Sequence, residues 1–349
     1  MQAIIEQFRD RILTAHAARS PLRLRGGGTK DWYGQRLQGE VLDTRAYSGV
    51  VDYEPTELVI TARCGTPLAE IETLLAERRQ MLAFEPPRFG PASTIGGVVA
   101  AGLSGPRRAA AGAVRDFVLG AKLMGHKGEL LNFGGQVMKN VAGYDVSRLL
   151  AGSLGTLGLI MEVSLKVLPM PVREETIRFE LDEIAALKAL NEWAGQPLPV
   201  SASCWHGGVL TVRLSGAEAA VQLALAKLGG ERVSGGAAFW TGLRDQTSAF
   251  FETETLWRLS LPPAASAVVL GGEQLIEWGG ALRWLKAAPE AADSIRRSVA
   301  AAGGHASLYR AQDKSAGAFH PLAPAVARIH ERMKAAFDPA GIFNPGRMY

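Results

Sequence analysis

The chain has 349 residues, more than one average domain, so we expect two compact units or one domain with an insertion. Its hydrophobic fraction of 47% and charged fraction of 21% are ordinary for a globular protein, whereas its 40 glycines are a clear excess. The net charge of +4 is spread along the sequence, with basic residues no denser than pairs such as Arg107 and Arg108, which argues against nucleic-acid binding.

The first elements are predicted from the spacing of apolar residues. Helical spacing predicts an amphipathic helix over 4–13, and alternation predicts a strand over 21–25 that runs directly into three glycines. A second strand is predicted over 58–62. The helix that follows it should begin at Pro67, with Thr66 as its N-cap.

The middle of the first half combines a long loop with a hairpin. Residues 84–112 are rich in glycine, proline and alanine, which lets the backbone approach a ligand closely. Strands are then predicted over 117–124 and 129–133, joined by a turn over 125–128. Prolines end this unit near Pro171, where we place a domain boundary.

The second half has a different character, with short strands alternating with alanine-rich helices such as those predicted over 187–193 and 218–228. Two strands over 275–278 and 281–285 flank a Gly-Gly pair, which predicts a hairpin with a two-residue turn. A helix over 321–336 precedes a tail punctuated by proline and glycine. The fold class expected from these patterns is α+β.

Three glycine-rich segments share one physical property. They are RGGGTK at 25–30, the segment 90–105 and GSLGTLG at 152–158, and each offers backbone N–H groups without a crowding Cβ, which suits phosphate oxygens. None contains GxGxxG at the start of a helix or GxxxxGK[ST], so a nicotinamide Rossmann site and a nucleotide-hydrolysing phosphate loop are both disfavoured. One such segment alone is more often a tight turn, and only the three together indicate a cofactor.

The order and spacing of these segments resemble the FAD-binding domain of the vanillyl alcohol oxidase and p-cresol methylhydroxylase (PCMH) superfamily, over about the first half of the chain. Four further segments are GLSGPRR at 102–108, AGAVRDFVLG at 111–120, QVMKNVAGYDVSRLLAGSLGTLG at 136–158 and the ending FDPAGIFNPGRM at 337–348. By these segments the whole chain resembles, within that superfamily, the smaller FAD-binding subunit of bacterial glycolate oxidase.

The resemblance implies a PCMH-type FAD-binding domain of two subdomains over 1–171, an α+β cap domain over 172–304 and a C-terminal segment, 305–349, that returns to the FAD domain. It also implies that FAD is bound without a covalent link, because Thr29 and Lys30 follow Gly28 where several members carry a linking histidine. The residues implied to contact FAD are Arg25, Gly26, Gly27, Gly28 and Thr29 at the pyrophosphate, Ser93, Thr94, Gly96 and Gly97 along the phosphate and ribityl chain, Gly102, Ser104 and Gly105 near the flavin, and Gly158 and Ile160 at the adenine end.

Catalytic residues are harder to predict. Related 2-hydroxyacid flavoproteins carry a histidine-rich metal motif in the cap, but the six histidines of this chain show no metal-ligand spacing, so no metal is expected. Glu277 and Arg283, in the predicted hairpin, could serve as general base and carboxylate clamp. The alternative is a solvated ion pair across the two strands.

By the resemblance, the chain takes part in the oxidation of glycolate to glyoxylate by a glycolate oxidase or dehydrogenase complex. Its partners would be a second, catalytic FAD-binding subunit and an iron-sulfur subunit that accepts electrons from the flavin, since no cysteine motif here could hold a cluster. The alternative is a non-catalytic assembly subunit whose FAD is structural or absent.

The sequence also bears on location. Cys64 and Cys204 are too few for a disulfide scaffold and belong to no C-x-x-C pair. The first twenty residues lack the continuous apolar core of a signal peptide, and no run of about 18 uncharged apolar residues predicts a membrane-spanning helix. We therefore expect a cytoplasmic protein, with peripheral attachment to the inner face of a membrane left open.

Overall fold

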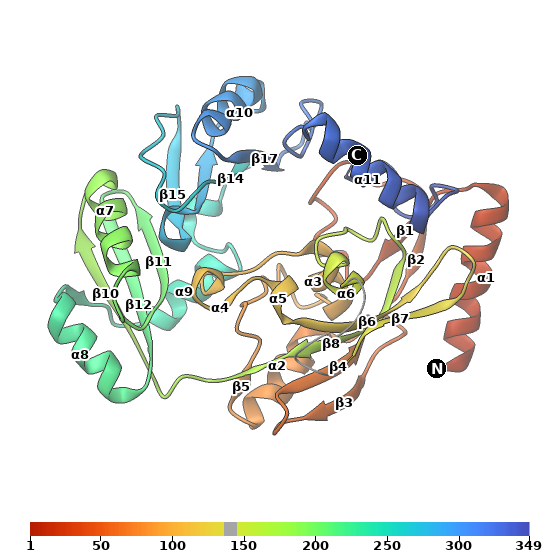
Figure 1. The fold of residues 1–349 in the computed structure, drawn as a ribbon, viewed down its shortest axis with the longest axis horizontal. Coiled ribbons are helices and arrows are strands. Elements are labelled where there is room, and N and C mark those ends of the chain that lie inside the picture. The colour runs from red at the N-terminus through yellow and green to blue at the C-terminus, as the bar shows by residue number, and fades with distance from the viewer. Residues whose placement is uncertain (136–144, 349) are drawn as a thin grey trace. The chain divides into compact units, whose positions relative to one another are not determined.

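The computed structural model describes residues 1–135 and 145–348. Residues 136–144, which belong to the segment 136–158 used above, lie outside the described residues. The chain divides into two compact units (Figure 1). Unit 1 comprises residues 1–103, 113–169 and 321–349, and unit 2 comprises residues 104–112 and 170–320.

These units differ from the expected domain boundaries in two places. Strand β17 (His305–Arg310) pairs with β14 (Leu256–Ser260) in unit 2, so the return to unit 1 begins at residue 321 and not at 305. Residues 104–112 also belong to unit 2, where Arg107 forms a 2.6 Å ion pair with Glu174. The first boundary, after residue 169, lies close to the expected one.

Unit 1 is built on a five-stranded antiparallel sheet and two small two-stranded sheets. The predicted opening helix, strands and hairpin are all present, and Phe8 and Ile12 of the opening helix are buried. The strand order of the large sheet is β3 (Val50–Glu54), β4 (Val59–Arg63), β8 (Leu159–Lys166), β6 (Val118–Met124), β7 (Leu130–Gly134). The small sheets pair β1 (Leu22–Arg25) with β2 (Glu40–Asp43) and β5 (Gln80–Met81) with β9 (Leu168–Pro169). The helices of unit 1 are α1 (Gln2–Ala18), α2 (Leu68–Glu77), α3 (Ile95–Ala101), α5 (Val114–Phe117), α6 (Val146–Leu149) and α11 (Pro324–Phe337).

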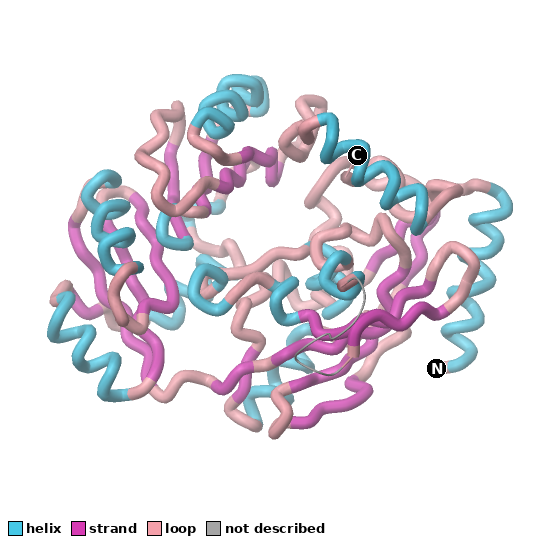
Figure 2. Tube along the Cα trace, in the orientation of Figure 1, coloured by secondary structure: helices cyan, strands magenta, loops and turns pink. Residues whose placement is uncertain are grey.

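Unit 2 is built on one eight-stranded antiparallel sheet. Apolar residues of helices α7, α8 and α10 pack on this sheet and form its two hydrophobic cores. The strand order is β13 (Glu231–Arg232), β10 (Arg173–Glu180), β12 (Val209–Gly216), β11 (Val200–His206), β15 (Glu273–Glu277), β16 (Leu282–Lys286), β14, β17. The helices of unit 2 are α4 (Arg108–Ala111), α7 (Glu183–Ala194), α8 (Glu218–Leu228), α9 (Gly236–Arg244) and α10 (Ala292–Ala301). Short 3-10 turns are η1 (Ala249–Phe251), η2 (Trp278–Gly280) and η3 (Pro289–Ala291). Long loops, drawn in pink in Figure 2, connect elements in both units.

Two local predictions are wrong. Thr66 does not cap α2, because its hydroxyl instead donates to the carbonyl of Arg63 and accepts from the backbone N–H of Gly49. The hairpin between β15 and β16 does not have a two-residue turn. Glu277 pairs with Leu282, so four residues form the connection, and it begins with Trp278 in a left-handed conformation (φ 56°) that a bulky residue seldom adopts.

Candidate functional site

The first glycine-rich loop leaves the end of β1 and lies directly against the backbone of the second. A Cβ on Gly27 would lie 1.5 Å from the carbonyl oxygen of Ala92, and one on Gly26 would lie 2.3 Å from the Thr94 hydroxyl. Any other residue at these two positions would push the loops apart. The glycines are therefore required by the contact between the two loops.

This loop also presents backbone donors. Among the described residues, none accepts a hydrogen bond from the backbone N–H of Gly26, Gly27 or Gly28. Gly28 has a positive φ of 72°, so the chain turns here in a way that favours glycine. Successive N–H groups in such a turn form a concavity that binds anions.

The second loop continues the same wall. Thr94 is the N-cap of α3 and accepts a hydrogen bond from the backbone N–H of Gly97 at 3.4 Å. A Cβ on Gly96 would lie 2.6 Å from the Cβ of Cys64, so α3 packs closely on the end of β4. This close packing places the first turn of α3 beside the RGGG loop.

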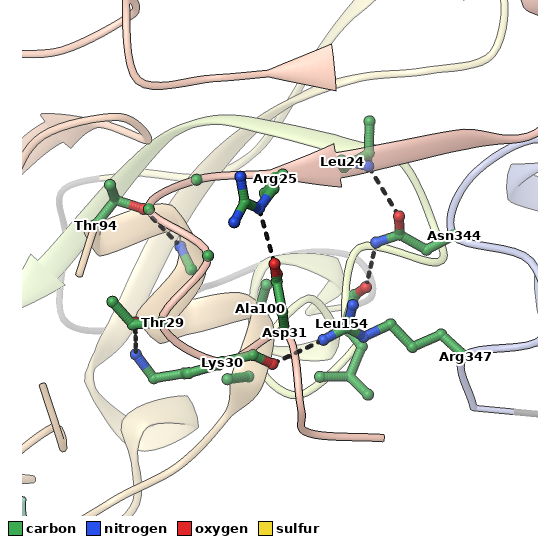
Figure 3. A pocket seen from close by; sticks show the side chains of 15 residues that line it. Leu24, Arg25, Thr29, Lys30, Asp31, Thr94, Ala100, Leu154, Asn344 and Arg347 are labelled. Atoms are coloured by element: carbon green, nitrogen blue, oxygen red, sulfur yellow. Dashed lines mark hydrogen bonds and ion pairs between the residues drawn. The ribbon is translucent and has the colours of Figure 1, made fainter. Parts of the chain in front are cut away.

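Charged side chains surround the first loop (Figure 3). The Arg25 Nε donates to Asp31 Oδ2 at 2.8 Å, and the same carboxylate accepts from Arg23. The Lys30 ammonium donates to the Ser93 hydroxyl at 3.0 Å. Arg347 is 7% exposed and donates to the carbonyl oxygen of Lys30 at 2.9 Å. Burial lowers the pKa of Arg347 to about 10, so its guanidinium stays positively charged at neutral pH.

The C-terminal tail closes the pocket from another direction. The Asn344 Oδ1 accepts a hydrogen bond from the backbone N–H of Leu24 at 2.8 Å, and its Nδ2 donates to the carbonyl oxygen of Leu154 at 2.7 Å. Figure 3 shows this side chain between the two backbone segments. One amide thus joins β1 to the third glycine-rich segment.

The structure brings most of the predicted cofactor residues together in unit 1. Two adjoining pockets share Arg25, Gly26 and Gly97 in their walls. The first also contains Gly27, Gly28, Thr29 and Thr94, and the second contains Gly96, Gly158 and Ile160.

Four predicted residues are absent from these two walls. Ser93 accepts a hydrogen bond from Lys30, which lines the first pocket. Gly102 ends α3, where a Cβ would lie 2.6 Å from the Cα of Gly152. Ser104 and Gly105 belong to unit 2. That Gly102, Ser104 and Gly105 approach a flavin therefore stays a prediction.

Several lining residues were missed by the sequence analysis: Asp31, Cys64, Ala100, Leu154, Asn344 and Arg347. The only sequence signal for the last two was the proline- and glycine-punctuated ending, whose apolar residues Ile342 and Phe343 are fully buried. Asp31 directly follows the RGGGTK segment, and Ala100 and Leu154 lie within the other two glycine-rich segments, whereas nothing in the sequence marks Cys64 as a neighbour of the RGGG loop.

Glu277 and Arg283 are not brought together. Glu277 pairs with Leu282 and Arg283 pairs with Ile276, so the two side chains point to opposite faces of the sheet. Both are buried, and they have different partners. The Glu277 carboxylate accepts from Trp284 Nε1 at 2.8 Å, whereas Arg283 donates to Glu183 at 3.3 Å and to three backbone carbonyls. Neither the proposed base and clamp nor the solvated ion pair describes this arrangement.

The part of the chain that the structure describes contains no group of three or more histidine, cysteine or carboxylate side chains that could hold a metal ion. In the same residues, no helix has the length and apolar character needed to cross a membrane.

Cys64, which lines the second pocket, is held in its neutral form. It is 2% exposed, and burial raises the pKa of its thiol to about 12. Because the thiolate is the reactive species, we expect neither Cys64 nor the equally buried Cys204 to react with Ellman's reagent at pH 8 in the native protein. Both should react after unfolding in guanidinium chloride. Rapid release of one thiol equivalent from the native protein would contradict this prediction.

The observed features fit FAD. The close contacts at Gly26 and Gly27 exclude any side chain at these positions. The backbone N–H groups of the first loop have no acceptor among the described residues, and cationic side chains surround this loop. A dinucleotide pyrophosphate is bound by such N–H groups and positive charges. The fold and the site thus define an FAD-binding flavoprotein. Residues 4–134 match the sequence model of the family described as FAD binding domain.

Comparison with known proteins identifies the family. The chain is 48% identical, over its whole length and 97% of the relative, to glycolate oxidase subunit GlcE of Escherichia coli. It is 32% identical over 171 residues to glycolate oxidase subunit GlcD of Bacillus subtilis, a match that covers 48% of this chain and 36% of that protein. A solved structure of alkyldihydroxyacetonephosphate synthase superposes with a TM-score of 0.68 at 15% identity, covering 97% of this chain and 74% of that one, and so shares the fold. The chain belongs to the GlcE family of glycolate oxidase subunits.

Proposed function

We propose that this chain is the FAD-binding subunit of a glycolate oxidase complex and takes part in the oxidation of glycolate to glyoxylate. Its cofactor is FAD, and its relatives are FAD-dependent oxidoreductases that act on 2-hydroxy acids. The observation that carries the proposal is the meeting of three glycine-rich segments and the C-terminal tail around one pocket system in unit 1.

In this proposal each wall has its own role. The N–H groups of Gly26, Gly27 and Gly28 hold the pyrophosphate, and Arg347 adds positive charge behind them. The pocket wall at Gly158 and Ile160 receives the adenine end. Unit 1 is then the FAD domain and unit 2 the cap. When bound, FAD supplies the acceptor for the two electrons released by oxidation of a 2-hydroxy acid.

The alternative is a non-catalytic assembly subunit, with FAD that is structural or absent. It is favoured by one observation, the separation of Glu277 and Arg283 onto opposite faces of the sheet, because this removes the pair predicted to act on substrate. Anaerobic addition of glycolate to the purified chain distinguishes the two. Bleaching of the flavin absorbance supports catalysis by this chain, whereas an unchanged spectrum supports the assembly role.

The subunit name of the relatives implies a complex of several chains. We propose that the other members are a second, catalytic FAD-binding subunit and an iron-sulfur subunit that receives the electrons. We also propose a cytoplasmic location with peripheral attachment to the inner face of the membrane. Co-purification from cells, followed by fractionation of cytoplasm and membrane, tests both.

We expect the FAD to be bound without a covalent link. Among the described residues that line the two pockets there is no histidine, and the one cysteine, Cys64, carries a thiol whose pKa is raised by burial. Precipitation with trichloroacetic acid should therefore leave the yellow colour in the supernatant. Colour retained in the washed pellet would show a covalent flavin.

A further inference from the structure

Strands β14 and β17 present different side chains on the two faces of the unit 2 sheet. Trp257, Leu259 and Leu308 belong to the hydrophobic core that includes residues of α10, and they alternate along β14 and β17 with residues of the opposite face. On that opposite face Arg258 lies directly across from Trp284 on β16 and from Ser307 on β17. Arg258 therefore lies on this face between an aromatic and a polar residue.

The guanidinium of Arg258 has an unusual environment. Its central carbon lies 5.3 Å from the centre of the Trp278 ring, and it forms no hydrogen bond or ion pair with any described residue. Two other arginines of unit 2 have hydrogen-bonded partners: Arg107 pairs with Glu174 at 2.6 Å, and Arg310 donates to the carbonyl oxygen of Phe251 at 2.9 Å. The ring holds Arg258 in place while its donors stay available.

Trp278 is held in place by burial and by a hydrogen bond of its indole. It is 6% exposed, has a left-handed backbone conformation (φ 56°), and donates from its Nε1 to the carbonyl oxygen of Gly105 at 3.0 Å. A second guanidinium, that of Arg108, lies 4.6 Å from the same ring centre. Strain of this kind persists only where surrounding contacts enforce it, and it is concentrated at functional sites.

Two further groups lie on the same face. His305 pairs with Ser260, two residues along β14 from Arg258, and burial followed by the charge of Arg258 lowers the pKa of its imidazole. It is therefore mainly neutral at pH 7 and can donate or accept a hydrogen bond. Glu277, on the same face as Trp284, accepts a hydrogen bond from that indole. An acidic group is thus present, but it already has a donor.

We infer that Arg258, stacked on Trp278 and next to His305, binds the carboxylate of a small 2-hydroxy acid. An arginine can donate two parallel hydrogen bonds to a carboxylate. Partial burial of a guanidinium costs free energy unless an anion pairs with its charge and accepts its hydrogen bonds. His305 can hydrogen-bond the adjacent hydroxyl group. This inference rests on the proposed function for its choice of ligand, and it replaces Arg283, which faces the other way, as the carboxylate-binding arginine.

The test is glycolate binding to the full-length, FAD-loaded protein, measured by calorimetry and by tryptophan fluorescence. Arg258→Gln should weaken binding by about 10- to 100-fold, because it removes a charged hydrogen-bonding group. Arg258→Lys should recover part of the loss, since it restores the charge without the fork geometry. The matched control is Arg178→Gln, which removes an exposed strand arginine paired with Glu231 in the same unit and should leave binding unchanged.

The flavin absorbance of each variant separates this inference from the proposed function. Loss of glycolate binding in Arg258→Gln, with FAD content and circular dichroism unchanged, supports the inference. Equal binding by Arg258→Gln and the parent protein overturns it, as does a parent protein that shows no binding up to about 10 mM glycolate. In either case an FAD-loaded protein leaves the proposed cofactor role standing, whereas a parent chain that binds no FAD contradicts that role directly.

Discussion

Replacing Gly27 by alanine should weaken FAD binding by about 100-fold or more and yield a protein that purifies without yellow colour. The added Cβ would lie 1.5 Å from the carbonyl oxygen of Ala92, so the RGGG loop and the loop before α3 must separate. Separation displaces the N–H groups of the first loop from the pyrophosphate. Losing two hydrogen bonds to a charged group costs about 3 to 6 kcal/mol. The measurement is the FAD dissociation constant, obtained by titrating the flavin-free protein.

A control with the same chemical change is Gly242→Ala, in α9 of unit 2. Its added Cβ meets its nearest neighbour at 3.7 Å, an ordinary contact, and alanine is the better helix former by about 1 kcal/mol. We expect this variant to bind FAD as the parent does. Thermal unfolding of both variants separates loss of the site from loss of the fold, and normal FAD affinity in Gly27→Ala would disprove the assignment of the loop.

Replacing Asn344 by alanine should lower the free energy of unfolding of unit 1 by about 3 to 5 kcal/mol. Asn344 is 4% exposed, and its loss leaves the N–H of Leu24 and the carbonyl oxygen of Leu154 without their partner. Its φ of 41° adds a cost, because alanine tolerates the left-handed region less well than asparagine. Urea unfolding followed by circular dichroism measures the change.

The variant Asn344→Gly divides this effect into two parts. Glycine accepts the positive φ but restores neither hydrogen bond, so it should still be clearly destabilised, by about 1 kcal/mol less than the alanine variant. A change of less than about 0.5 kcal/mol in both variants would mean that the tail does not hold the pocket together. Because the same amide links β1 to the third glycine-rich segment, weaker FAD binding should accompany the loss of stability.

Features governed by neighbours in the sequence were predictable. The hairpin of β6 and β7 was predicted because alternation and a short glycine-bounded turn are local properties, and α1 because its apolar residues repeat at helical spacing. The failure at the β15–β16 connection, by contrast, has a cause that is not local in the sequence. Trp278 adopts a backbone conformation that its residue type disfavours, and contacts elsewhere in unit 2 enforce it.

By itself, the sequence determined the glycine-rich segments, the α+β class and the family resemblance, because backbone freedom and apolar periodicity depend only on residue type and on spacing along the chain. Only the tertiary structure decided which side chains meet. Asn344 bonds to Leu24 across 320 positions, and strand register places Glu277 and Arg283 on opposite faces while putting Arg258 beside Trp278. The physical reason is that such contacts depend on sheet register and chain return, which no local pattern encodes.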